Sequence, residues 1–187
     1  MKQTHIFKDP PGVIASAAVG GKMEGEGPMG EYFDKINDDP YMSADTFEKG
    51  ESKLQKQALL HMLEKAGLKE AEIDLLFGGD LLNQCTGTTY GIREFGIPFL
   101  GLYGACSTMA EGLLMASAFT AAGYAKRAAA VTSSHFCSAE RQYRYPLNYG
   151  GQRPPTAQWT ATAGGALCVS AGGRAPYVRG FTVGKVG

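Results

Sequence analysis

The sequence lacks an excess of charge of either sign, and it lacks a long apolar run. Its 187 residues carry 18 lysines and arginines against 18 aspartates and glutamates, so the formal net charge is zero. This balance excludes a nucleic-acid binder that works by bulk positive charge. No apolar stretch approaches the roughly 20 residues of a membrane-spanning helix. The N-terminal stretch MKQTHIFKDPPGV lacks the apolar region of a signal peptide. We therefore expect a cytoplasmic or membrane-peripheral protein without a signal peptide or transmembrane helix.

Cysteine is also scarce, and its spacing excludes the common metal sites. None of the four cysteines forms a C-x-x-C pair, and the three histidines do not stand at metal-ligand spacing with them. We therefore expect no metal and no cofactor. An arbitrary cysteine in such a chain is a small buried apolar residue in a reducing compartment.

The sequence does contain predicted strands that alternate with predicted helices, as in an α/β protein. Hydrophobic residues make up 44% of the chain and charged residues 19%, which indicates a globular fold. Strands are predicted over 13–19, 73–77, 98–103, 127–133, 160–170 and 177–186, helices over 45–66, 88–94 and 107–122, and loops over 20–40 and 134–158. This order predicts a mostly parallel five-stranded sheet with a buried central helix and helices on its faces.

The turn before the helix predicted over 107–122 carries a thiol. Cys106 follows Gly104 and Ala105, and the helix after it has a single charged residue, Glu111. Backbone N–H groups at a helix N-terminus lower the pKa of a thiol and can hold an oxyanion. Ligands of parallel sheets bind at such strand-to-helix turns. Three roles stay open for Cys106: a catalytic nucleophile, a residue that lines a pocket, and a small core residue.

A second group of candidate residues lies between Ser133 and Pro155. His135, Glu140, Arg141 and Arg144 stand there among several tyrosines. Guanidinium groups bind carboxylates through paired hydrogen bonds, and tyrosine rings offer stacking faces, so the segment suits a planar, anionic, aromatic ligand. A solvated loop at a subunit interface explains the same composition, since arginine and tyrosine are enriched in interfaces.

Several longer motifs resemble a known superfamily. GACSTMAEGL is similar to the nucleophile turn of thiolases and ketoacyl synthases, LEKAGLKEAEIDLLFGGD to the helix and strand before it, and WTATAGGALCVSAGG to the strand that closes the first half. More narrowly, GDLLNQ, IPFLGLYGACST, VTSSH, AERQYRYP and YGGQRP together resemble the stage V sporulation protein AD family. The resemblance extends from about Phe7 to Gly187.

The resemblance implies a fold and a function. It implies that residues 1–187 form a single thiolase-like N-terminal half-domain. The second half is then absent from this chain, which suggests a truncated gene or a fragment. Alternatively, two chains associate to cover the apolar face that the second half would cover. It further implies a homodimer at the spore inner membrane that binds dipicolinic acid (pyridine-2,6-dicarboxylate) and takes part in its uptake with other subunits of that machinery.

The expected site combines the turn at Cys106 with the segment that follows the strand predicted over 127–133. The ligand-binding residues are Cys106, Ser133, His135, Glu140, Arg141 and Arg144, and no catalytic residue is expected. The alternative is a Cys-dependent acyltransferase or ketoacyl-synthase-like condensing enzyme with Cys106 as the nucleophile. A scaffolding subunit without a small-molecule ligand is a third hypothesis.

Overall fold

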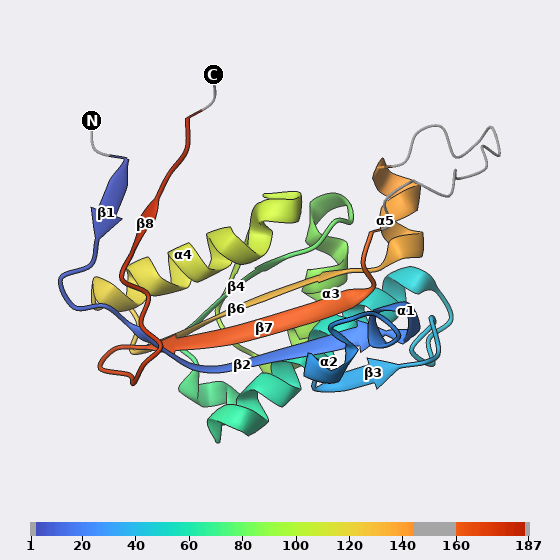
Figure 1. Ribbon diagram of the computed structural model, residues 1–187, viewed down its shortest axis with the longest axis horizontal. Helices are drawn as coiled ribbons and strands as arrows, with labels where there is room; N and C mark the ends of the chain where they lie inside the picture. Colours follow the sequence, from blue (N-terminus) through green and yellow to red (C-terminus); the bar gives the residue numbers. More distant parts are fainter. Residues whose placement is uncertain (1–2, 144–159, 186–187) are drawn as a thin grey trace.

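A computed structural model describes residues 3–143 and 160–185 of the chain, with only the backbone described for residues 140–143. Figure 1 shows a mixed sheet with helices on both faces. The strands are β1 (Thr4–Ile6), β2 (Gly12–Gly21), β3 (Lys35–Asn37), β4 (Leu75–Gly79), β5 (Phe99–Gly101), β6 (Arg127–Ser134), β7 (Ala163–Ser170) and β8 (Gly180–Thr182). The α-helices are α1 (Lys22–Gly25), α2 (Phe47–Ala66), α3 (Thr86–Ile92), α4 (Thr108–Ala121) and α5 (Phe136–Tyr143).

The main sheet has six strands in the order β3-β2-β7-β6-β4-β5. β4 pairs in parallel with both β5 and β6, and β2 pairs in parallel with β3. β7 is antiparallel to both of its neighbours, β2 and β6. The α/β class predicted from the sequence is confirmed, with three parallel and two antiparallel pairings.

Two short strands change the predicted five-stranded sheet. β3 lies inside the segment 20–40 that was predicted to be a loop, and its three residues are too few to show an alternating pattern. β8 leaves the main sheet and pairs with β1 in a separate two-stranded sheet, where Thr4 faces Thr182. This small sheet projects from one end of the molecule (Figure 1).

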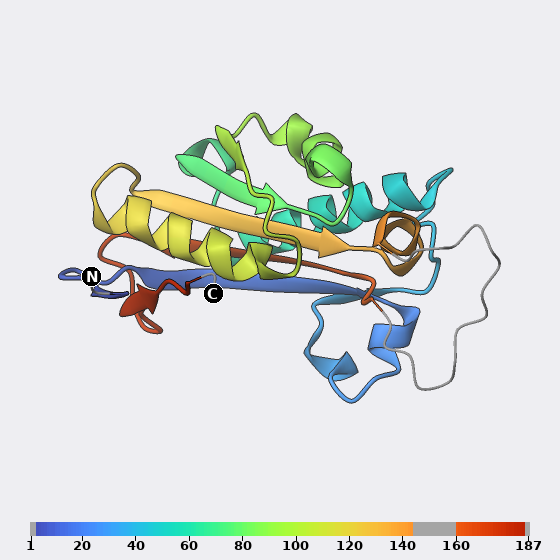
Figure 2. The ribbon, with the colours of Figure 1, turned by 90° about the horizontal axis from the view of Figure 1, so that it is seen from above.

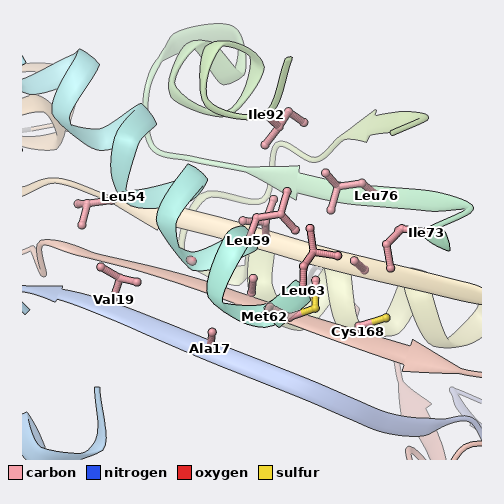
Figure 3. Packing of buried hydrophobic residues seen from close by; sticks show 14 of the residues in the cluster. Ala17, Val19, Leu54, Leu59, Met62, Leu63, Ile73, Leu76, Ile92 and Cys168 are labelled. Carbon is pink, nitrogen blue, oxygen red and sulfur yellow. The ribbon is translucent and has the colours of Figure 1, made fainter. Parts of the chain in front are cut away.

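Helix α2 covers one face of the sheet and builds the larger core. Thr46 caps its start by accepting a hydrogen bond from the Lys49 N–H at 3.2 Å, and Gly67 ends it in the left-handed conformation at φ 65°. Figure 3 shows its apolar residues over the strands. Leu54, Leu59 and Met62 are fully buried there. A Cβ on Gly164 of β7 would lie 2.9 Å from the Leu54 carbonyl oxygen, so only glycine permits this approach.

Helix α4 covers the opposite face (Figure 2). The strands alternate between the two layers: Leu76 packs toward the α2 side, while Phe77 packs with Ala116 of α4. The sequence predicted that α4 is buried all round. In this chain it is buried along one stripe, namely Thr108, Gly112, Ala116, Ser117 and Thr120, because only the sheet covers it among the described residues.

Candidate functional site

An open cavity of about 730 Å³ lies where the parallel strands β4 and β6 end and α4 begins. The same end of the sheet carries α5, which follows β6 directly (Figure 1). Small residues and hydroxyl groups make up much of its wall, among them Cys106, Thr132, Ser133, Ser134 and Gly164. The cavity therefore occupies the edge at which parallel sheets bind ligands.

Cys106 stands at the mouth of this cavity with its side chain exposed. It lies in a 3₁₀ turn, Ala105–Ser107, that leads into α4. Ala105 adopts a φ of 48°, in the left-handed region that L-residues rarely occupy. A Cβ on Gly104 would lie 2.6 Å from Glu111 Oε2, so a larger residue there would displace the Glu111 side chain. The tight turn brings the thiol to the cavity.

A buried carboxyl group lies behind the cavity wall. Glu51 projects from α2 and is fully buried. The Ser133 hydroxyl, at the end of β6, donates a hydrogen bond to Glu51 Oε1 at 3.1 Å, and the Ser138 hydroxyl of α5 donates to Oε2 at 2.6 Å. Both of its oxygens are thus bound by neutral donors. Burial, together with the negative charge of Asp80, raises the pKa of Glu51 to about 7 in spite of the two serine hydrogen bonds, which lower it.

Asp80 is a second buried acid at the same edge, directly after β4. Its carboxylate accepts hydrogen bonds from the Leu82 N–H at 2.7 Å and from both the N–H and the hydroxyl of Thr88. The Gln55 side chain, one turn after Glu51 on α2, donates to the Gly79 carbonyl and to the Thr88 hydroxyl. These bonds hold the end of β4 and the start of α3 against α2.

The structure places His135 beneath this edge. Its ring is fully buried and lies 5.1 Å from the Phe47 ring. Because Nε2 lies 2.6 Å from the Pro40 carbonyl oxygen and Nδ1 accepts the Cys137 N–H at 3.2 Å, we assign the Nε2–H tautomer. Burial lowers the pKa of His135, which keeps the ring neutral. Both ring nitrogens are occupied by backbone, so in this arrangement the ring holds the Pro40 segment.

The predicted site residues are thus only partly brought together. Cys106 and Ser133 line one cavity, whereas His135 supports the structure behind it. Glu140 and Arg141 lie in α5, where only the backbone is described, and Arg144 lies outside the described residues. Their role as ligand-binding residues stays a prediction.

Sequence reasoning missed Glu51 and Gln55, although a signal for both existed. They occupy positions on the same helix face as Leu54 and Ala58, which are buried. A polar residue at a core-facing position of an amphipathic helix needs buried partners, so the pattern itself points to a polar network.

The described residues offer neither a metal-binding cluster nor a membrane-spanning helix. Within residues 3–143 and 160–185, no group of three or more histidine, cysteine, aspartate or glutamate side chains is arranged to hold a metal ion. In the same ranges no helix combines the length and apolarity that crossing a bilayer requires.

Alkylating reagents are expected to modify Cys106 faster than the buried cysteines. Its side chain is exposed, whereas Cys85 and Cys168 are buried, and burial raises the pKa of Cys168 to about 12 and also raises that of Cys85. At pH 8, iodoacetamide should label Cys106 at least about 10-fold faster than either of them. Peptide mapping by mass spectrometry measures the rates, and urea-unfolded chain, in which all sites become equal, is the control. Equal labelling in the folded chain would contradict this geometry.

Both the sequence and the fold of this chain are similar to those of known proteins. The family model of stage V sporulation protein AD matches residues 1–187. Stage V sporulation protein AD of Bacillus subtilis (strain 168) is 44% identical over 185 residues, which cover 99% of this chain and 55% of that protein. The chain therefore spans about half the length of this curated relative.

Solved structures with a similar fold are ketosynthases and related proteins. The 3-oxoacyl-[acyl-carrier-protein] synthase III of Aquifex aeolicus VF5 has a TM-score of 0.57 at 16% identity, over 89% of this chain and 54% of that one. Cerulenin-bound OleA of Xanthomonas campestris has a TM-score of 0.59 at 13% identity, over 89% of this chain and 58% of that one. At these identities the likeness establishes the thiolase-like fold alone.

Proposed function

This chain belongs to the stage V sporulation protein AD family, and we propose that it serves sporulation as a non-enzymatic protein that binds dipicolinic acid during its uptake into the spore. The observation that carries the proposal is the open cavity beside Cys106. Its wall combines small residues, which leave room for a flat ring, with the hydroxyl group of Thr132, which can donate a hydrogen bond to a carboxylate.

Protection of the Cys106 thiol tests this proposal. Saturating dipicolinate is expected to slow the alkylation of Cys106 at least about 5-fold, because the ligand would cover the thiol. Pyridine-2,6-dicarboxamide has the same shape without the charges and serves as the control compound, and Cys137 serves as the control thiol. An alkylation rate of Cys106 that dipicolinate leaves unchanged would argue against binding in this cavity.

The alternative is an acyltransferase in which Cys106 is the nucleophile, and one observation favours it: the exposed thiol stands on a strained turn at the start of α4. Against it, the ring nitrogens of His135 hold backbone groups and are not available to the thiol in this arrangement. Incubation with acetyl-CoA and intact-mass analysis distinguish the two functions. An acetyl adduct that disappears in Cys106→Ala would favour the enzyme.

Assembly into a homodimer, together with other subunits of the uptake machinery, also belongs to the proposal. β5 is the last strand of the main sheet, and Leu100 within it and Tyr103 just after it are exposed. An unpaired edge strand with apolar side chains supports pairing with a second copy. Analytical ultracentrifugation of the Leu100→Lys variant and of the unchanged chain tests this pairing. We expect the dimer to dissociate at a higher protein concentration in the variant than in the unchanged chain.

A further inference from the structure

The hydrogen bonds around Glu51 accommodate two charge states without movement of heavy atoms. With Glu51 ionised, the Ser138 hydroxyl donates to Oε2 at 2.6 Å. The same hydroxyl lies 3.1 Å from the His135 carbonyl oxygen, which is a second acceptor. When a proton sits on Oε2, the carboxyl group donates to the Ser138 oxygen, and the Ser138 hydroxyl turns to the His135 carbonyl. A buried acid that keeps its partners in both states is suited to exchange a proton.

Ser133 joins this carboxyl group to the cavity. It lines the cavity wall, and its hydroxyl oxygen lies 3.1 Å from Glu51 Oε1. A ligand carboxylate in van der Waals contact with Ser133 therefore stands within about 7 Å of Glu51. Two negative charges at that separation disfavour each other, the more so because Glu51 is fully buried.

The other ionisable groups acting on Glu51 add to this effect. Asp80, at the end of β4, and Glu48, one turn earlier on α2, both raise its pKa. From the β6–α5 side, the described partners are the hydroxyl groups of Ser133 and Ser138, and the buried His135 ring is neutral. Among the residues whose side chains are described, no cation is hydrogen-bonded or ion-paired with Glu51. A proton that binds to Glu51 is then the simplest way to remove the repulsion between Glu51 and the ligand carboxylate.

We propose that Glu51 is a proton-binding site coupled to the cavity, which takes up one proton from solvent when a small carboxylate ligand binds against Ser133 and releases it when the ligand leaves. No covalent bond is made or broken apart from this transfer to Glu51 Oε2. The inference rests on the proposed function for the identity of the ligand, while the proton site itself is a property of the free chain.

Calorimetry with dipicolinate in two buffers of different ionisation enthalpy tests the coupling. Between pH 7 and 9 both ligand carboxylates stay ionised, so any proton taken up during binding is bound by the protein. We expect uptake in the unchanged chain, and an affinity that falls by up to about tenfold per pH unit above about pH 7. Glu51→Gln should bind without proton uptake. Glu64→Gln, an exposed position on the same helix, is the matched control and should behave as the unchanged chain.

The outcomes separate the two proposals. Dipicolinate binding with a heat that does not depend on the buffer would overturn the coupling and leave the proposed function intact. An absence of binding would overturn the proposed function and the coupling together. In that case, ¹³C NMR titration of the Glu51 carboxyl carbon in the ligand-free chain still tests the proton-binding site. A titration near neutral pH supports that site, and one at the ordinary glutamate value overturns it.

Discussion

Glu51→Gln is expected to remove a large part of the pH dependence of folding stability. The folded carboxyl group binds its proton more tightly than the unfolded one, because burial raises its pKa from 4.5 to about 7. Its contribution is therefore fully present below about pH 4.5 and is lost as the pH rises through about 7, by about 3 kcal/mol. Glutamine resembles the protonated acid, since its NH₂ group can donate to Ser138. The variant should be the more stable chain at pH 8.

Urea denaturation of both chains at several pH values between 4 and 8 gives this comparison. His135 acts in the opposite direction: burial lowers its pKa, so its contribution is present above about pH 6.5 and is lost as the pH falls. The difference between the two chains at each pH removes this background. Glu64→Gln is the exposed control. Stability curves that run parallel for Glu51→Gln and the unchanged chain would show that Glu51 titrates normally.

His135→Ala is expected to destabilise the chain at pH 7 by about 2 to 4 kcal/mol. The substitution leaves a cavity beside the Phe47 ring and removes the hydrogen bond to the Pro40 carbonyl at 2.6 Å. It also leaves the Cys137 N–H without its imidazole acceptor. The free energy of unfolding from urea denaturation measures the effect.

His61→Ala is the matched control, because His61 is half-buried on α2 and its Nδ1 lies 3.6 Å from Glu64 Oε2. It should change stability by less than about 0.5 kcal/mol. A similarly small change for His135→Ala would contradict the structural role of the ring, and would return His135 to the candidates for ligand binding.

The sequence predicted α2, α4 and β6 well because their patterns are local, whereas α5 lies inside the segment 134–158 that was predicted to be a loop. The residues of α2 repeat with helical spacing and end at Gly67, whose left-handed conformation the structure confirms. β6 was predicted over 127–133 and extends one residue further, to Ser134. Cys106 lies on the strand-to-helix turn that the sequence predicted, since a small-residue turn between an apolar strand and an apolar helix is a local signal. Its role as a ligand-binding residue stays a prediction.

What could not be predicted depends on contacts between distant segments. β7 was predicted as a strand, but its antiparallel direction follows from Ser134 and Ala163 facing each other, so the chain leaves and re-enters the sheet at the same edge. The partners of the buried Glu51 carboxyl group, Ser133 and Ser138, lie more than 80 residues away in the sequence. The helical pattern indicates that Glu51 faces the core, but no local pattern identifies these partners.

Isothermal titration calorimetry of this chain with dipicolinate tests the proposal that the cavity beside Cys106 binds dipicolinic acid. Cys106→Trp is the decisive variant, because Cys106 is exposed and a large ring there would fill the cavity mouth without disturbing the core. We expect one dipicolinate bound per chain, and an affinity at least about 100-fold weaker in the variant, a loss of about 2.7 kcal/mol. Absence of binding heat in the unchanged chain, or equal affinity in Cys106→Trp, would contradict it.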